Sequence, residues 1–380
     1  VGAYSLAPVA KCLAEVTGLV VTFLTDCCGA EVERACADPM PGSIILLENL
    51  RFHMEEEGKG LDAAGKKVKA KPENAARFRA SLARLADVYV NEAFGTSHRS
   101  HSSMLGEGYR DRICGFLVQK ELAAFQRAFD NPKRPMLAIL GGMKLSDKIL
   151  VIMHMLDKVD MMIIGGGMAF TVLKAAEGMA IGDSIYDREG VAMVPGIIAK
   201  ARRNGVELML PVDFTISSQF GEDGVVTTAT REEGIPKGFI GLDCGERSRL
   251  LNAEMCARAG TIIWTSALGV VQMPKFEAGT KSLAEAIVKA TGRNAITIIG
   301  GGNAATCSRK YNVERKVTHC SFANRTFLEL LKGKGASLPG IVNLSPKPYL
   351  QQPPPPPQQL EPQPQPTHAP PQRLLPQELP

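Results

Sequence analysis

Short apolar runs, rich in β-branched residues, recur along most of the chain. A strand that is buried on both faces reads as a continuous apolar run, so each run predicts a strand of an open parallel sheet. The predicted strands are Leu19–Thr25, Ser43–Leu47, Val88–Asn91, Met136–Leu140, Met161–Ile164, Glu207–Pro211, Thr261–Trp264, Ile296–Ile299 and Val317–Cys320.

Amphipathic segments with helical spacing lie between these runs. The predicted helices are Pro8–Thr17, Ala75–Leu85, Glu121–Phe129, Leu145–Val159, Ala169–Glu177, Ser282–Thr291 and Thr326–Leu331. A further helix, Ala192–Arg203, contains Pro195 and Gly196, which are expected to kink or shorten it. The alternation of strand and helix predicts an α/β protein whose parallel strands are joined by right-handed crossovers.

The helical segment around Lys120–Asp130 is followed by "NPKRP", which predicts a hinge between two domains. We therefore expect an N-terminal domain over residues 1–119, a hinge helix over 120–131 and a C-terminal domain over 132–344. Residues 345–380 form a tail rich in Pro and Gln that holds more than half of the 25 prolines. Such a tail cannot bury a core and is expected to be disordered or extended. It could dock a proline-reading domain or be an inert extension, and both readings stay open.

Composition narrows the class of protein. The chain has 380 residues and is 45% hydrophobic, which is enough for two domains with real cores. The net charge of +5 is mild, and no basic run with interleaved aromatic residues is present, so nucleic acid is not an expected partner. No apolar run reaches membrane-spanning length, which argues against a membrane partner.

The cysteines indicate the redox setting. Nine Cys are scattered without a CxxC pair, and the adjacent Cys27 and Cys28 do not form an ordinary zinc pair. No signal peptide is apparent. Together these features predict a reducing, cytoplasmic location.

Glycine-rich turns follow several predicted strands: "LAILGGMKLSDKI", "MIIGGGMAFTVL" and "TIIGGGNAATC". In an open parallel sheet, ligands bind beyond the carboxyl ends of the strands, where glycine lets the backbone approach a phosphate. One such turn can serve packing alone, but three in one domain favour a phosphate site. Lys144 and Lys148 lie four residues apart, on one face of an expected first helical turn. They could face an anion there or be solvated surface lysines.

The N-terminal half has a basic cluster of its own. Arg51 and His53 follow one predicted strand in "LLENLRFH", and His98, Arg99 and His101 follow another in "VNEAFGTSHRSHSS". The fixed fork of an arginine suits a phosphate or a carboxylate.

These motifs, in this order, resemble phosphoglycerate kinase from Tyr4 to about Val342. The motifs that carry the resemblance are "YSLAPVA", "GSIILLENLRFHMEEEGKG", "VYVNEAFGTSHRSHSS", "LAILGGMKLSDKI", "MIIGGGMAFTVL", "LPVDF", "GLDCG", "ITIIGGGNAATC" and "LELLKGK". The resemblance implies two Rossmann-like domains with parallel sheets joined by a hinge helix. It also implies phosphoryl transfer between ATP and 3-phosphoglycerate in glycolysis, with Mg²⁺ bound alongside ATP or ADP.

The resemblance also implies roles for individual residues. It places the substrate 3-phosphoglycerate on Arg51, His98 and Arg99, and the phosphoryl groups on the catalytic residues Lys144 and Lys148. The nucleotide-binding residues that it implies are Gly141, Gly142, Gly166, Gly167, Gly241, Leu242, Gln272, Gly300, Gly301, Gly302, Asn303 and Ala304. Asn303 is also the implied magnesium ligand, at a position where the family has Asp.

Several positions depart from the family pattern. The family's Trp-Asn-Gly-Pro-x-Gly-x-x-Glu reads "WTSALGVVQ" here, so that Gln272 replaces the Glu that would hold the ribose. Asn303 replaces the magnesium-binding Asp and lacks the charge that Mg²⁺ prefers, while Ala304 replaces a Thr. The Ser-Thr-Gly-Gly-Gly turn has become Ser321–Arg325, and Phe322, Phe327 and Arg325 are expected to intrude on it.

The opening of the family pattern is also missing. The chain begins at Val1 and lacks the Asp-Phe-Asn-x-Pro and His-Leu-Gly-Arg-Pro motifs. The N-terminal domain is therefore expected to be incomplete and to leave apolar surface and strand edges open.

Three hypotheses of function follow. The chain could be an active phosphotransferase, a kinase-like protein without catalysis that binds nucleotide weakly, or an interaction protein or decayed gene copy defined by its tail. We predict membership of the phosphoglycerate kinase family with turnover reduced by several orders of magnitude, or absent.

Overall fold

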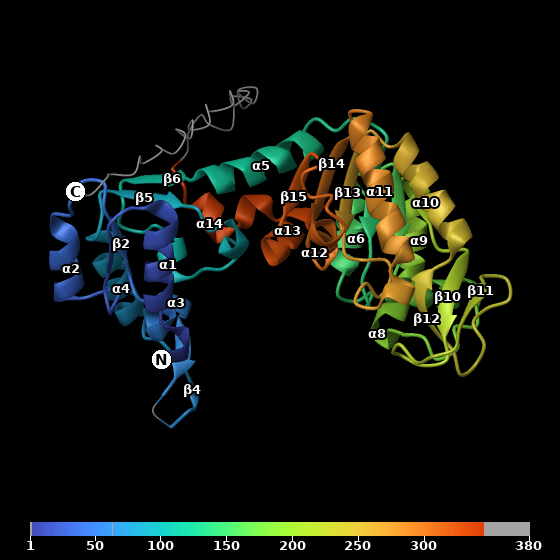
Figure 1. Cartoon of the computed structure of the whole chain (residues 1–380), viewed down its shortest axis with the longest axis horizontal. Coiled ribbons are helices and arrows are strands. Elements are labelled where there is room, and N and C mark those ends of the chain that lie inside the picture. Colours follow the sequence, from blue (N-terminus) through green and yellow to red (C-terminus); the bar gives the residue numbers. More distant parts are fainter. Residues whose placement is uncertain (1, 63, 346–380) are drawn as a thin grey trace, which may run out of the picture. The chain divides into compact units, whose positions relative to one another are not determined.

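The computed structural model describes residues 2–62 and 64–345 (Figure 1). Its largest sheet has six parallel strands in the order β15-β14-β13-β7-β8-β9. These strands are β7 (Met136–Leu140), β8 (Met161–Ile164), β9 (Glu207–Met209), β13 (Thr261–Thr265), β14 (Ile296–Gly300) and β15 (His319–Ser321). The predicted α/β class with parallel sheets is confirmed. Residues 346–380 of the predicted tail lie outside the described residues.

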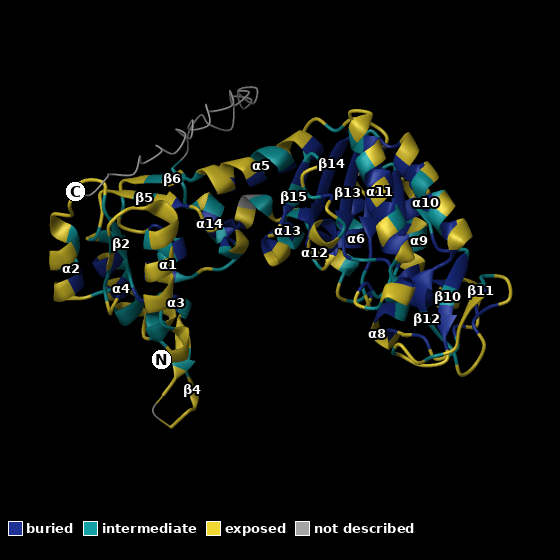
Figure 2. Cartoon of the chain, viewed as in Figure 1, coloured by how far each residue is buried: buried dark blue, intermediate teal, exposed yellow. Residues whose placement is uncertain are grey.

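Helices cover both faces of this sheet, and each face has its own core. Along β7, Met136, Ala138 and Leu140 pack into one core, whereas Leu137 and Ile139 pack into the other. This period-2 alternation explains why the strands read as continuous apolar runs, and Figure 2 shows them buried between helices. The first core includes α5 (Phe116–Phe129), α6 (Ile149–Met155), α7 (Gly167–Glu177), α9 (Val194–Arg203) and α13 (Asn324–Leu331). The second includes α10 (Glu246–Arg258), α11 (Ala278–Gly292) and α12 (Ala304–Lys310).

A smaller antiparallel sheet, not predicted from the sequence, has the strand order β11-β10-β12. Its strands are β10 (Asp213–Ser217), β11 (Val226–Thr230) and β12 (Ile240–Cys244). The exposed residues of β11 are mostly threonines. This strand therefore lacks the continuous apolar run from which the parallel strands were predicted. The remaining elements of this half are α8 (Arg188–Val191) and the 3-10 turns η5 (Pro274–Phe276) and η6 (Gly335–Ser337).

The N-terminal part contains three two-stranded sheets. The strands β1 (Val21–Phe23) and β2 (Ile44–Leu46) pair in parallel, as do β5 (Val88–Asn91) and β6 (Asp111–Cys114), while β3 (Lys59–Leu61) and β4 (Lys67–Lys69) form a hairpin. Around them lie α1 (Ala7–Thr17), α2 (Ala30–Ala37), α3 (Met54–Glu57), α4 (Pro72–Ala83), η1 (Gly2–Tyr4), η2 (Leu50–Phe52), η3 (Phe94–Thr96) and η4 (Ser102–Met104). Val88, Val90 and Ile113 of the β5–β6 pair are exposed. The β5–β6 pair therefore carries exposed apolar surface.

Two helix predictions can be compared directly with the structure. Pro195 lies in the first turn of α9, which begins at Val194, so the predicted shortening is confirmed. The predicted helix Leu145–Val159 is wrong at its start, because residues 146–148 form a turn and α6 begins only at Ile149. Lys144 and Lys148 therefore do not share a first helical turn.

Residues after η6 make hydrogen bonds with the N-terminal part of the chain. In α14 (Pro339–Val342), the Gly340 amide donates to the Ser97 carbonyl at 2.9 Å and its carbonyl accepts from Asn91 Nδ2 at 2.6 Å. The Ser345 amide donates to the Arg112 carbonyl at 2.7 Å. The domain boundaries remain predictions, but these bonds attach residues 340–345 to the segment predicted as the N-terminal domain.

Candidate functional site

The first two glycine-rich turns lie side by side at the carboxyl edge of the six-stranded sheet. Gly141 and Gly142 follow β7, and Gly166 and Gly167 follow β8. A Cβ on Gly141 would collide with the Ala267 carbonyl, and one on Gly166 would lie 2.8 Å from the Gly142 carbonyl. Gly166 also has a φ of 65°, which a larger residue rarely adopts. Glycine is needed here because backbone packs directly on backbone.

The two candidate catalytic lysines differ in environment. Lys144 is exposed in the loop after β7, whereas Lys148 is half-buried and its chain passes 3.7 Å from the position of a Cβ on Gly142. Burial lowers the pKa of Lys148, and the charge of Lys332 lowers it further, while Asp147 opposes the shift. Of the two, Lys148 is held closest to the glycine turn.

The turn after β14 contacts the segment that replaces the family's glycine-rich cradle. Gly300, Gly301 and Gly302 lead into α12, with Asn303 as its N-cap residue and Ala304 buried behind it. The Gly302 amide donates a hydrogen bond of 2.6 Å to Asn324 Oδ1. A backbone donor of the predicted phosphate loop is therefore already paired within the protein.

Phe322, Arg325 and Phe327, which were expected to intrude on the turn after β15, lie in different surroundings. Phe327 is fully buried and packs edge-on against Phe125 at 5.0 Å, while Phe322 is exposed beneath Arg309 at 4.3 Å. Phe327 is turned into the core, where its ring lies 2.6 Å from the position of a Cβ on Gly300, whereas Phe322, which precedes α13, lies on the surface. Arg325 is exposed in the first turn of α13.

Of the residues predicted near adenosine, Gly166 and Gly167 lie at the start of α7, and Gly241 and Leu242 lie in β12. Gly241, in β12, packs against the ring of Phe170 and its amide donates to Ser184 Oγ at 2.9 Å. The Leu242 carbonyl accepts from Val270 at 3.0 Å, which brings β12 beside the loop that carries the exposed Gln272. That loop begins at β13 and also touches the β8 turn, since Leu268 lies 2.6 Å from the position of a Cβ on Gly165. The loop thus links the glycine turns to Leu242.

The N-terminal basic residues converge on an acidic side chain that the sequence analysis did not single out. Arg51 Nε lies 3.1 Å from Glu57 Oε1, and Arg99 Nη1 lies 4.0 Å from the same oxygen. His101 Nε2 is 3.9 Å from it. The "HMEEEG" run immediately after Arg51 was the available signal. The fold therefore brings Arg51 and Arg99 together, with Glu57 as their shared partner.

His98 lies apart from this group and faces α13. Its Nδ1 is 2.8 Å from Thr326 Oγ1, which itself donates to the Gly95 carbonyl at 2.9 Å. Burial lowers the pKa of His98, and the positive charges of Arg99 and Arg325 lower it further. His98 is thus expected to be neutral near pH 7 and to bind α13 through a hydrogen bond.

One buried group at the sheet edge has no partner. Thr265 Oγ1, at the end of the central strand β13, makes no hydrogen bond among the residues that the structure describes. It lies 2.9 Å from the position of a Cβ on Gly301. Thr265 stands where the family pattern has Asn, in the stretch "WTSALGVVQ".

The loop that the resemblance assigns to magnesium does not fit that ion. Residues 300–304 read Gly-Gly-Gly-Asn-Ala and contain no carboxylate, and the exposed Asn303 offers one neutral amide oxygen. Magnesium is usually held by one or two carboxylates together with substrate phosphates. This loop alone is therefore not expected to hold a magnesium ion.

An α/β fold whose glycine turns gather at the carboxyl edge of a parallel sheet is typical of nucleotide-binding proteins. The family profile described as phosphoglycerate kinase matches residues 1–334. The chain is 54% identical to a probable phosphoglycerate kinase of Caenorhabditis elegans over 343 residues, covering 90% of this chain and 82% of the relative. It is 55% identical to phosphoglycerate kinase 2 of Homo sapiens with the same coverage.

Solved structures agree with these relatives. The phosphoglycerate kinase of Coxiella burnetii matches with a TM-score of 0.76 at 33% identity, covering 89% of this chain and 80% of that one. The chain belongs to the phosphoglycerate kinase family. It is by family a transferase of glycolysis that moves a phosphoryl group between ATP and 3-phosphoglycerate. Within the described residues, no helix is both long and apolar enough to cross a membrane.

Proposed function

We propose that this chain is a phosphoglycerate kinase with turnover reduced by several orders of magnitude, or absent. The observation that carries the proposal is the bond of 2.6 Å from the Gly302 amide to Asn324 Oδ1. A backbone amide of the phosphate loop must be free to stabilise charge on a transferring phosphoryl group. Here a side chain from the altered turn after β15 competes for it.

The glycine turn after β7 supplies another part of the proposed nucleotide site. Phosphates are proposed to bind beside Gly141 and Gly142, with Lys144 and Lys148 as the proposed catalytic cations. Lys148 beside Gly142 supports this assignment. Adenosine is proposed to lie near Gly166, Gly167, Gly241 and Leu242, with its ribose near Gln272. Residues 300–304 are proposed to form the magnesium-nucleotide loop. Gln272 can hydrogen-bond a ribose hydroxyl but lacks the charge of the Glu expected there.

The substrate side is proposed to bind 3-phosphoglycerate through Arg51 and Arg99, and through His98, which faces α13. The convergence of both arginines supports the assignment, and Glu57 is the group that a substrate anion must displace. The bond between His98 and Thr326 ties this side to α13, on which Asn324 also lies.

The proposed chemistry makes few demands for proton transfer. The acceptor is a carboxylate, which is already ionised at pH 7, so no general base is needed. Catalysis then comes from positioning and from neutralising the charge on the phosphoryl group. In this family Mg²⁺ accompanies ATP or ADP, and we propose that this chain binds the magnesium-nucleotide complex weakly, because Asn303 cannot contribute a charge.

The proposal is tested by coupled-assay turnover of the full chain with ATP and 3-phosphoglycerate, beside the human relative as reference. We expect kcat to be lower by at least about a thousandfold, since losing a single such donor costs about 10²–10³. Asn303→Asp alone should not restore it, because Asn324 still holds the Gly302 amide. Adding Asn324→Gly should raise kcat above that of Asn303→Asp.

Two outcomes would overturn the proposal: an ordinary rate for the unmodified chain, or full rescue by Asn303→Asp alone. A thermal melt with and without saturating Mg-ADP separates weak catalysis from loss of the nucleotide site, because a ligand that binds only the folded state raises Tm.

We further propose a cytoplasmic location, in keeping with the scattered free thiols. A proline-reading partner for the tail is a separate proposal that a pull-down with the tail peptide would test.

A further inference from the structure

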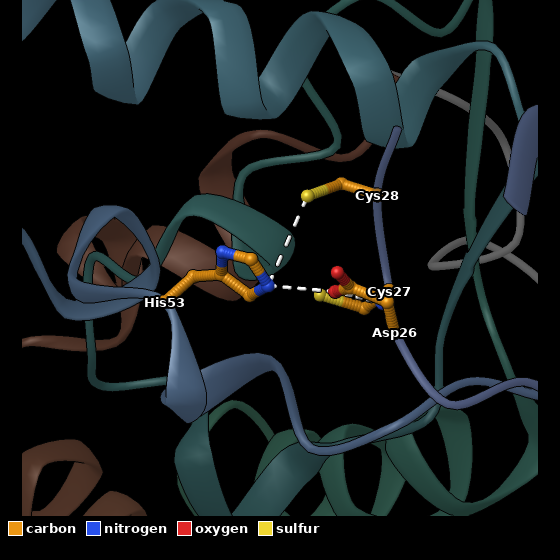
Figure 3. A group of neighbouring side chains, drawn as sticks. All are labelled: Asp26, Cys27, Cys28 and His53. Carbon is orange, nitrogen blue, oxygen red and sulfur yellow. Dashed lines mark hydrogen bonds and ion pairs between the residues drawn. The ribbon is translucent and has the colours of Figure 1, made fainter. Parts of the chain in front are cut away.

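A cluster of four potential metal ligands lies away from the phosphotransfer site. The strands β1 and β2 are parallel, so their carboxyl ends meet at one edge of their sheet. The chain after β1 supplies Asp26, Cys27 and Cys28, which precede α2, and the chain after β2 supplies His53, which precedes α3. Figure 3 shows the His53 ring pointing toward the three other side chains.

The distances within the cluster suit a single small cation. One ligand atom from each residue lies within 4.8 Å of every other. His53 Nε2 is 2.7 Å from Asp26 Oδ1 and 3.9 Å from Cys28 Sγ. Tetrahedral zinc, with bonds of about 2.0–2.3 Å, separates its ligand atoms by roughly 3.3–3.8 Å. Movements of the ligand atoms by about 1 Å would therefore complete the coordination.

The protein holds these side chains in place. Cys27 is only 1% exposed, and its amide donates to Asp26 Oδ1 at 2.6 Å, which orients the carboxylate. The His53 ring packs against Phe78 at 5.5 Å. A pocket of about 340 Å³ is lined by Cys28 and His53, so two of the four candidate ligands face it.

The charges around the cluster favour a cation. Asp26 is itself one of the four candidate ligands, and Glu55 lines the pocket beside Cys28 and His53. Their negative charges attract a positive ion. Although Cys27 and Cys28 are adjacent and lack the usual spacing of a zinc pair, the turn before α2 brings both sulfurs to His53.

We propose that Asp26, Cys27, Cys28 and His53 bind one thiophilic divalent d¹⁰ cation of the zinc class. On binding, the Cys27 and Cys28 thiols each lose a proton to solvent and coordinate through sulfur. The Nε2 lone pair of His53 and one oxygen of Asp26 complete the set, with the imidazole proton on Nδ1. The ion takes the place of the hydrogen bond between His53 and Asp26.

The site is tested on the full chain with Co²⁺ as a spectroscopic probe and with Zn²⁺ in competition with a chromophoric chelator. We expect one equivalent of Co²⁺ to give the near-ultraviolet charge-transfer band of a cobalt–thiolate bond and the visible bands of tetrahedral cobalt. One equivalent of Zn²⁺ should remove both. This readout needs no variant and so does not depend on how a variant folds.

Variants then assign the ligands. Cys28→Ser and His53→Gln should each weaken Zn²⁺ binding by at least about a hundredfold, since losing even an outer partner of a ligand costs about 10–100-fold. Cys12→Ser is the matched control, because Cys12 is an exposed thiol on α1 and outside the cluster. It should leave the affinity and the cobalt spectrum unchanged.

Three results would overturn the proposal. The first is a cobalt spectrum without a thiolate band. The second is binding that Cys12→Ser weakens as much as Cys28→Ser does. The third is a Zn²⁺ affinity that His53→Gln leaves unchanged in a variant with the near-ultraviolet circular dichroism of the parent. Because none of these readouts involves phosphoryl transfer, the metal site stands or falls independently of the proposed kinase activity.

Discussion

At the scale of the residue, Ser266 shows how a departure from the family pattern acts on the backbone. It follows the central strand β13 with a φ of 67°, in the left-handed region that favours glycine. Its carbonyl accepts a bond of 2.7 Å from Trp264 Nε1, which keeps this peptide in place. A side chain larger than glycine costs about 1–2 kcal/mol in this conformation.

Ser266→Gly is therefore expected to stabilise the protein. The relief of strain exceeds the roughly 0.4–1 kcal/mol that glycine adds to the entropy of the unfolded chain, so the free energy of unfolding should rise by about 0.5–1 kcal/mol. Urea denaturation measures it. Asn294→Gly is the control, because Asn294 has a φ of 65° but asparagine tolerates this region. Equal gains from the two substitutions would contradict the argument.

At the scale of the element, Glu33 joins α2 to α4. Its carboxylate accepts from Arg84 Nε at 2.8 Å and from Arg84 Nη2 at 2.7 Å, and from Ser81 Oγ at 2.8 Å. The hydrogen bonds with Arg84 and Ser81 lower the pKa of Glu33 to about 2. Because the folded-state pKa lies below the ordinary value of 4.5, the stabilisation is present above pH 4.5 and is lost as pH falls toward 2.

Glu33→Gln should consequently lower Tm at pH 7, and the difference from the parent should shrink between pH 4.5 and the lowest pH at which the chain still folds. Glu31→Gln, an exposed position on the same helix, is the control and should shift Tm little at either pH. A difference for Glu33→Gln that stays constant across this range would show that its effect is not electrostatic.

Elements were predicted from the sequence more completely than contacts between them. Strands buried on both faces, such as Met136–Leu140 and Met161–Ile164, were found at their predicted bounds because burial on both faces requires continuous apolar runs. The strand β11 has no continuous apolar run and was not predicted. The glycine turns were located because close backbone approach permits only glycine.

Side-chain contacts between distant segments could not be predicted from the sequence pattern. His53 meets Asp26 through the pairing of β1 with β2, and Glu57 meets Arg99 through the packing of segments that are distant in the chain. The bond from Gly302 to Asn324 likewise depends on the parallel pairing of β14 with β15. Spacing within one segment carries no information on such contacts.

At the scale of the whole molecule, a buried pair connects α5 to the edge strand of the six-stranded sheet. His319 Nε2, on β15, lies 2.8 Å from Glu121 Oε2, and both side chains are 5% exposed. These residues are 198 positions apart. The pair therefore fixes the predicted hinge helix to β15, next to the segment that carries Asn324.

Breaking one side of this pair should cost more than removing both. Glu121→Leu leaves a buried imidazole without its partner and is expected to lower the free energy of unfolding by at least about 2 kcal/mol. The double variant Glu121→Leu/His319→Leu should recover most of that loss, because neither polar group is then left buried. Chemical denaturation of the parent, both single variants and the double variant gives the coupling energy of the pair.

Lys120→Ala, exposed on the same helix, is the control and should change stability by no more than about 0.5 kcal/mol. A double variant as unstable as the sum of the singles would mean that the pair is not what holds α5 to β15.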